Sequence, residues 1–258
     1  MGLNRYFVPN LPEAGSVLLP ADESHHALRV RRETVGGRCI AFDGLGNSAN
    51  CRIAHIDKRD VTLAIDSFRF EPNELPGKLT LAVAMPKGDR QKAVIEKAVE
   101  LGVHELIPIL CFRSVSLPNE TASEKWGRTV IEACKQCERN RLMTIGSPCS
   151  IESLLQTALS PEGVSPNAEL RIFAHPTGNS IRTNNIASLY DPVDQQASRI
   201  TIAIGPEGGF TDAEVDLARQ ANWQQLDLGS RILRVETAVC VASIFASLRL
   251  MPHASQLG

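Results

Sequence analysis

The pattern of hydrophobic and polar positions changes near residue 70 of the chain. Before that point, short apolar runs alternate with turn-forming residues, at a spacing that predicts strands. The strands are expected at residues 6–8, 16–19, 38–42, 50–54 and 61–65. Only residues 24–32 have a helical pattern. Several short strands at this spacing predict a small β-barrel.

Residues 71–77 contain two prolines and a glycine, which interrupt both strands and helices. After them, strand-like runs alternate with helix-like runs, which predicts an α/β domain with a mostly parallel sheet. The predicted strands are 79–85, 103–110, 170–174, 200–204 and 226–228, and the helices are 89–101, 124–137, 151–159, 211–221 and 236–250. We therefore expect a first domain at 1–72, a linker at 73–78 and a second domain at 79–258.

Local signals mark the ends of two of these helices. Asp89 stands where a side chain caps a helix, and Gly102 follows the last apolar position of that helix. Thr211 and Glu214 have the spacing of a capping box, which predicts a helix beginning at residue 212.

Composition limits the class of protein. Of the 258 residues, 43% are hydrophobic and 22% are charged, which is typical of a soluble globular chain. The seven cysteines are scattered, so we expect a reducing compartment and no disulfide scaffold. The N-terminus has no apolar segment of a signal peptide, and the apolar run 238–250 is too short to span a bilayer. These features predict a cytoplasmic protein without a membrane segment.

Charge gives only a local hint of nucleic-acid binding. The net charge of −2 argues mildly against a nucleic-acid binder, which usually carries a basic surface. Basic residues cluster near positions 29–32, 87–92 and 135–141, although a solvated helix face explains each cluster better when the cluster is taken by itself.

Two glycine-bearing loops follow predicted strands near the C-terminus, at residues 205–209 and at 229. Loops at strand ends in an α/β domain predict a crevice for a small polar ligand. Glu207 occupies the place of the second glycine of a dinucleotide fingerprint, and no phosphate-binding lysine motif follows. A tight turn alone would also require these glycines, so both interpretations stay open.

Other candidate sites are less specific. Arg231, Arg234 and Glu236 precede the final helix; the glutamate suits a helix N-terminus, and the two arginines suit an anion or a developing oxyanion. Cys134 and Cys137 lie inside a helical pattern, which predicts packing rather than redox chemistry. No histidine spacing or second cysteine pair predicts a metal site.

Taken together, these residues resemble the RsmE family, the ribosomal RNA small subunit methyltransferase E group of SPOUT methyltransferases. The resemblance is carried by IGPEGGF at 204–210 and LGSRILRVETA at 228–238. Further similar segments are MPKG at 85–88, IEKAVELGV at 95–103, EACKQCERNR at 132–141 and SHHALRVR at 24–31.

The resemblance implies a PUA-like β-barrel followed by a SPOUT α/β domain with a trefoil knot. It also implies S-adenosylmethionine as the methyl donor and N3 of a uridine in 16S rRNA as the acceptor. The RNA would be bound in the small ribosomal subunit or in an assembly intermediate. The enzyme would be a homodimer with its active site near the subunit interface.

The resemblance and this chemistry together imply candidate residues, of which His175 and Pro176 come from the resemblance alone. Loss of the N3 proton leaves negative charge on the uridine, which a guanidinium stabilises. The expected catalytic residues are Arg234, with Glu207 or Glu236 as proton acceptor or orienting group. The expected donor-binding residues are His175, Pro176, Ile204, Gly205, Pro206, Glu207, Gly208, Leu228, Gly229, Ile232, Leu233, Thr237 and Ala238. The expected RNA-binding residues are Arg5, His26, Arg29, Arg31, Arg32, Lys87, Arg139 and Arg141.

Two alternatives remain at this point. The chain could be a SPOUT methyltransferase that acts on tRNA or on a ribose 2′-hydroxyl, because substrate choice rests on analogy. It could also be an RNA-binding protein that has lost catalysis, although intact glycines and Arg234 favour an enzyme.

Overall fold

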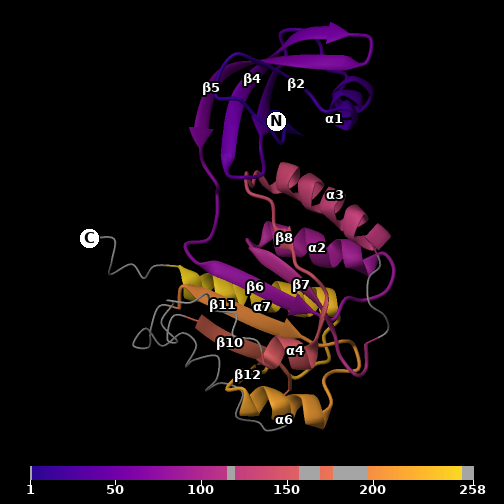
Figure 1. Cartoon of the computed structure of the whole chain (residues 1–258), viewed down its shortest axis with the longest axis vertical. Coiled ribbons are helices and arrows are strands. Elements are labelled where there is room, and N and C mark those ends of the chain that lie inside the picture. The colour runs from indigo at the N-terminus through magenta and orange to yellow at the C-terminus, as the bar shows by residue number, and fades with distance from the viewer. Residues whose placement is uncertain (1, 115–119, 157–168, 177–196, 252–258) are drawn as a thin grey trace, which may run out of the picture. The chain divides into compact units, whose positions relative to one another are not determined.

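The computed structural model describes residues 2–114, 120–156, 169–176 and 197–251 (Figure 1). Its contacts divide the chain into two compact units. The first unit comprises residues 1–74 and 131–142, and the second comprises 75–130 and 143–258. Residues 131–142 thus cluster with the first unit, although the sequence pattern placed them in the second domain. The division into functional domains stays a prediction.

A five-stranded mixed sheet forms the first unit, in the order β1-β3-β4-β5-β2. β1 pairs in parallel with β3, and the other neighbours are antiparallel. Each predicted strand is present, and the two that form the long central hairpin are longer than expected. The strands are β1 (Asn4–Phe7), β2 (Ser16–Leu18), β3 (Arg38–Phe42), β4 (Asn47–Asp57) and β5 (Asp60–Phe70). The short helix α1 (Ala21–His25) continues into a π-helical turn, η1 (His26–Arg31).

Alternation along these strands builds the core of the first unit. Tyr6, Cys39, Cys51 and Leu63 are all buried, because every second side chain points to the same face of a sheet. Ala27 from η1 packs into the same cluster. The helical segment therefore covers the apolar face of this sheet.

The second unit contains a parallel sheet in the order β12-β10-β11-β6-β7-β8, with β9 also paired to β7. All its pairings are parallel, as the alternating pattern predicted. The strands are β6 (Lys78–Val83), β7 (Glu105–Leu110), β8 (Thr144–Ile145), β9 (Cys149–Ser150), β10 (Glu169–Ala174), β11 (Arg199–Ile204) and β12 (Gln224–Leu226). The helices are α2 (Arg90–Glu100), α4 (Ile151–Gln156), α6 (Asp212–Gln220) and α7 (Val235–Leu250), together with the part of α3 (Glu120–Cys137) that precedes residue 131.

Helices cover both faces of this sheet. α7 packs against β6, β11 and α2, whereas α4 contacts α6. Ala82, Phe173 and Ala203 from the central strands belong to a buried cluster with residues of α4 and α6. In a parallel sheet, the carboxyl ends of the strands meet at one edge, so the loops after β10 and β11 lie close together.

The two predicted helix caps have different outcomes. The capping box is confirmed: the backbone N–H of Glu214 donates to Thr211 Oγ1 at 3.3 Å, and the Thr211 N–H donates to Glu214 Oε2 at 2.7 Å. The Asp89 cap is wrong, because its side chain accepts no capping hydrogen bond. Asp89 already has helical dihedrals (φ −66°, ψ −17°), whereas a capping residue needs an extended backbone.

Candidate active site

A cavity of about 270 Å³ lies in the second unit, at the carboxyl ends of β10 and β11. This volume is near the lower end of small-molecule sites, which begins at roughly 300 Å³. The loops after β7, β10, β11 and β12, together with the first turn of α7, form its walls. The lining residues are Arg113, Ala174, His175, Pro176, Ile204, Gly205, Pro206, Glu207, Gly208, Gly209, Phe210, Asp227, Leu228, Gly229, Arg231, Ile232, Leu233, Val235 and Ala238.

The structure brings nearly all the residues expected to bind the donor around this one cavity. Both glycine loops contribute, the first from residue 205 onwards and the second around Gly229. Within the described part of the chain, Thr237 is the expected donor-binding residue that does not line the cavity; it is exposed on the first turn of α7. That these residues hold a cofactor stays a prediction.

Glycine has two separate uses in the loop after β11. Gly209 has φ +69°, which other residues rarely adopt, and its N–H closes a turn by donating to the Pro206 carbonyl at 2.8 Å. Gly208 instead gives clearance, because a Cβ there would lie 3.1 Å from Cδ of Arg113. The loop is therefore both sharply turned and closely approached by a side chain.

Glu214 ties together two loops that are distant in sequence. Its buried carboxylate accepts from the Phe112 N–H at 2.8 Å through Oε1. Its Oε2 accepts from the backbone N–H of Thr211 at 2.7 Å. The loop after β7 is thereby fixed beside the loop after β11, because one carboxylate serves both.

Arg113 lies on the wall of the cavity, and sequence reasoning did not identify it. Its Nη1 donates to the carbonyl of Gly208 at 2.6 Å and, at 3.5 Å, to that of Phe210. The side chain is otherwise exposed. A single arginine in a loop without a motif gives no local signal, so only the three-dimensional contact reveals it.

His175 carries a polar atom that the described protein does not satisfy. Its ring lies 6.4 Å from the rings of both Phe173 and Phe210, measured between centroids. Nδ1 is buried and has no hydrogen-bond partner among the described residues. Burial lowers the pKa of the imidazole, and the positive charge of Arg219 lowers it further. The ring is therefore neutral near pH 7 and leaves one nitrogen for a ligand.

These features fit the flat adenine ring of a nucleoside. Ile204, Leu228, Leu233 and Ala238 provide apolar walls, and the glycines leave backbone groups accessible. A buried polar atom without a partner is costly unless a ligand satisfies it, which the imidazole of His175 invites. The apolar and hydrogen-bonding groups of the cavity therefore fit S-adenosylmethionine.

The three predicted catalytic residues occupy different positions. Glu207 lines the cavity, and its Oε1 lies 2.6 Å from Nη1 of Arg90. Arg234 is exposed at the N-cap of α7 and does not line the described cavity. Glu236 lies in the first turn of α7, with its Oε2 buried and without a hydrogen-bond partner in the described structure. The cavity-lining arginines of the described chain are Arg113 and Arg231.

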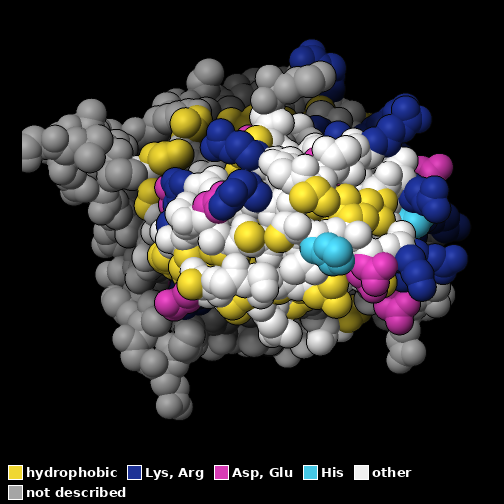
Figure 2. Space-filling view, turned by 90° about the horizontal axis from the view of Figure 1, so that it is seen from above, with side chains coloured by type: hydrophobic (Ala, Val, Ile, Leu, Met, Phe, Trp, Pro, Cys, Tyr) yellow, Lys and Arg dark blue, Asp and Glu magenta, His cyan; other side chains and the backbone are white. Residues whose placement is uncertain are grey.

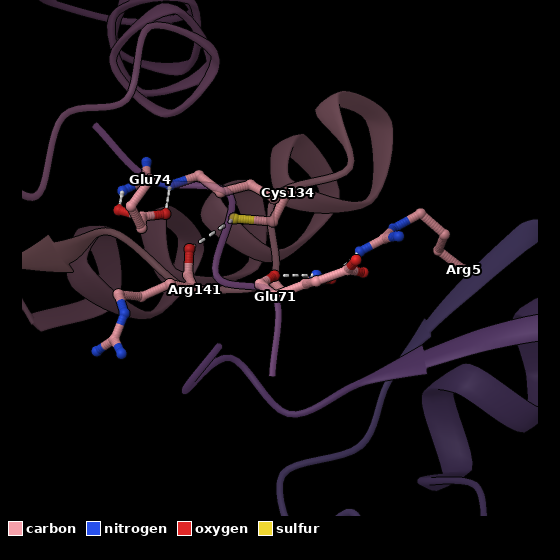
Figure 3. A network of polar contacts seen from close by, with 7 residues as sticks. Arg5, Glu71, Glu74, Cys134 and Arg141 are labelled. Carbon is pink, nitrogen blue, oxygen red and sulfur yellow. Dashed lines mark hydrogen bonds and ion pairs between the residues drawn. The ribbon is translucent and has the colours of Figure 1, made fainter. Parts of the chain in front are cut away.

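Three of the predicted RNA-binding arginines belong to a polar network inside the first unit (Figure 3). Arg139 is only 2% exposed, and its Nε and Nη2 donate to the two carboxylate oxygens of Glu74 at 2.6 and 2.7 Å. A direct RNA contact by Arg139 would require this buried ion pair to open. Arg141 takes part through its carbonyl, which accepts from Sγ of Cys134 at 3.6 Å.

Arg5 is held in the same network. Its Nη2 donates to Oδ1 of Asn140, whose Nδ2 donates to the carbonyl of Glu71. The guanidinium also lies over the Phe42 ring, 5.1 Å from the centroid. Arg5 thus connects β1 to residues 138–142, and its predicted RNA contact stays a prediction.

The remaining predicted RNA-binding residues are more accessible. Arg29, Arg31, Arg32 and Lys87 are exposed, and half-buried His26 accepts a hydrogen bond at Nε2 from Nε of Arg31 at 3.2 Å. In the first unit, a groove of about 550 Å³ is lined by His25, Arg29, Lys58 and Arg59, with Ala21, Leu28 and Asp60. Lys and Arg side chains also gather at the edges of the face seen in Figure 2. Their exposed positive charge suits a phosphate backbone.

Among the described residues, no three His, Cys, Asp or Glu side chains come close enough to hold a metal ion. None of the helices described has the length and apolar character needed to cross a membrane. No disulfide joins the cysteines of the described residues, and Cys134 is buried and Cys137 half-buried at the end of α3.

Two family models match the chain, and together they cover both units. One, described as an RNA methyltransferase domain, matches residues 73–247. The other, described as an RNA methyltransferase PUA domain, matches residues 19–66.

Two relatives of similar sequence share one name. The ribosomal RNA small subunit methyltransferase E of Bacillus subtilis is 31% identical over 251 residues, which cover 92% of this chain and 93% of the relative. The protein of the same name from Rickettsia conorii is 31% identical over 258 residues, or 97% of each chain.

Two solved structures are similar along nearly their whole length. A methyltransferase from Legionella pneumophila, solved with the bound cofactor SAM, has a TM-score of 0.82 and 28% identity, covering 96% of this chain and 98% of that one. The ribosomal RNA small subunit methyltransferase E of Neisseria gonorrhoeae, bound to S-adenosyl methionine, has a TM-score of 0.80 and 26% identity, covering 94% and 96%.

Proposed function

The chain belongs to the ribosomal RNA small subunit methyltransferase E family, and we propose that it transfers a methyl group from S-adenosylmethionine to N3 of a uridine in 16S rRNA. The observation that carries this proposal is the single cavity formed by both glycine loops. Similar chains with bound S-adenosylmethionine support the choice of donor.

The donor is held by the residues that line the cavity. The apolar walls formed by Ile204, Leu228 and Leu233 receive the adenine, and His175 offers its neutral imidazole for a hydrogen bond. When bound, S-adenosylmethionine supplies a methyl group on a positively charged sulfur. A neutral His175 adds no positive charge beside that sulfonium, which favours binding.

The acceptor must lose its N3 proton before it attacks. In the transfer, the N3–carbon bond forms as the carbon–sulfur bond breaks, the bonding pair stays on sulfur, and the proton passes to a base. Glu207, which lines the cavity, is one candidate base, and Glu236 is the other. Arg234 stands between cavity-lining Leu233 and Val235 in sequence and stabilises the negative charge of the acceptor.

The first unit holds the RNA. Its exposed basic residues bind the phosphate backbone, which makes affinity depend on salt. The mixed sheet would close as a PUA-like barrel, and the chain of the second unit would form the trefoil knot of SPOUT enzymes. The acceptor base has to leave any stack to reach the cavity. The substrate is the small subunit or an assembly intermediate, so the enzyme works in the cytoplasm.

The enzyme acts as a homodimer. Support comes from α7, where Val241, Ile244 and Leu248 are 38%, 49% and 48% exposed. Their spacing places them on one side of the helix, and exposed apolar residues grouped in this way mark interfaces. Sedimentation should therefore show a dimer that Ile244→Asp weakens.

The experiment that tests the function maps modified nucleotides. Small-subunit rRNA from a deletion strain should lack one N3-methyluridine, and the gene should restore it. Unchanged rRNA modification, or a missing methyl group on tRNA or on a ribose 2′-hydroxyl, would reject the proposed substrate.

A further inference from the structure

Arg113 is a cation built into the cavity wall whose charge has no assigned role. It comes from the loop after β7, far in sequence from both glycine loops, yet it lines the same cavity. Its neighbour Phe112 is anchored through the backbone by Glu214, the same carboxylate that caps α6. The position of Arg113 is thus fixed from two sides.

The guanidinium is held through only one of its nitrogens. Nη1 donates to the Gly208 carbonyl at 2.6 Å, and neither Nε nor Nη2 has a partner among the described residues. No carboxylate pairs with Arg113 in the described chain, whereas Arg90, also in the second unit, is paired with Glu207. A guanidinium carries five N–H donors in a planar fork, so several of them remain for a ligand.

The charges of the two substrates decide which of them the Arg113 guanidinium binds. A positive charge gains nothing from a sulfonium, so Arg113 does not recognise the donor's reacting end. A uridine that has lost its N3 proton carries negative charge over N3 and the two carbonyl oxygens beside it. Donors already in place where charge develops lower the barrier, because they need no reorganisation.

We propose that Arg113 is a further catalytic residue, which binds a carbonyl oxygen beside N3 and stabilises the deprotonated uridine. This rests on the proposed function. In this role, Arg113 supplies a guanidinium in addition to that of Arg234. The candidate proton acceptors are still Glu207 and Glu236. The hydrogen bond to the Gly208 carbonyl orients the guanidinium, so that its remaining N–H groups donate to the uracil ring of the acceptor.

The test compares Arg113→Met and Arg113→Lys with the wild-type protein and with Lys92→Met. Lys92 is a matched control, since it is an exposed cation of the second unit paired with Glu96 on α2. Single-turnover methylation of small subunits from the deletion strain is measured against pH at saturating donor. Donor affinity is measured separately by calorimetry with S-adenosylhomocysteine.

We expect Arg113→Met to slow methylation by about 100-fold, the usual effect of removing one charge-stabilising donor. The rise of its rate with pH should move to higher pH, because the uridine then loses its proton less readily. Arg113→Lys should recover part of the rate, and donor affinity should stay within about threefold in all variants, a difference under about 1 kcal/mol.

Two results would overturn this role. An unchanged rate and pH profile in Arg113→Met would show that the charge is not used. A loss of donor affinity that matches the loss of rate would show that Arg113 only holds the Gly208 loop. A wild-type protein that binds no donor and methylates no rRNA would instead reject the proposed function itself.

Discussion

Arg139 of the first unit and Arg113 of the second unit differ in which groups their guanidinium meets. In the first unit, Arg139 is buried and both ends of its fork meet Glu74, and Arg5 is enclosed by Asn140 and Phe42. In the second unit, Arg113 lines a cavity, and its Nε and Nη2 have no partner among the described residues. A basic residue whose partners lie in the protein stabilises the fold, whereas one that faces a cavity unpaired is available for a ligand.

Breaking the buried pair of the first unit should have the largest effect on stability. Glu74→Ala leaves the Arg139 guanidinium buried without its carboxylate, which costs about 3–5 kcal/mol of unfolding free energy. Chemical denaturation measures this loss. Glu71→Ala is the control, because its carboxylate forms an exposed pair with Arg69 at 3.5 Å, and such pairs contribute less than about 1 kcal/mol. Equal losses in the two variants would contradict the structural role of Arg139.

Filling the cavity edge should have the next largest effect, on binding and not on stability. Gly208 lines the cavity, so a valine side chain there would take up space that the donor needs. Its Cβ would also lie 3.1 and 3.4 Å from Cδ and Cβ of Arg113. We expect Gly208→Val to weaken S-adenosylmethionine binding by about 30-fold, close to 2 kcal/mol. Gly127→Val is the control, because a Cβ at position 127 meets nothing within 4 Å. Normal affinity in Gly208→Val would place the donor elsewhere.

The smallest expected effect is the change in stability with pH that His175 causes. Burial lowers the pKa of His175 in the folded state, so the unfolded chain takes up this proton more readily. Stability is therefore fully present above the unfolded pKa, near 6.5, and falls as the pH drops below it. His175→Phe should lose less stability than the wild type between pH 7 and pH 5, measured by thermal unfolding. Parallel curves for the two proteins would exclude this contribution.

Local signals predicted the strands of the first unit and most elements of the second, where the short strands β8 and β9 were missed. The strands of the first unit and the capping box at Thr211 follow from patterns within a few residues, which is the range over which propensity acts. The glycine loops were also visible, because a turn at the end of a strand needs glycine at positions such as Gly209. Their meeting at one cavity followed from the parallel sheet.

Long-range pairing could not be predicted in the same way. The partners of Arg139 and Arg113 lie 65 and 95 residues away along the chain, and no periodicity encodes such contacts. Residues 131–142 cluster with the first unit for the same reason, since their partners are Glu71, Glu74 and Arg5. Asp89 failed as a cap because its backbone is already helical, which residue type alone does not reveal.

Calorimetric titration of the full chain with S-adenosylmethionine tests the central claim most directly. The account predicts saturable binding of one donor per chain, weakened in Gly208→Val and preserved in Gly127→Val and Glu71→Ala. Absence of binding to the wild-type chain, or equal binding by the Gly208→Val and Gly127→Val variants, would contradict the assignment of the cavity between the two glycine loops.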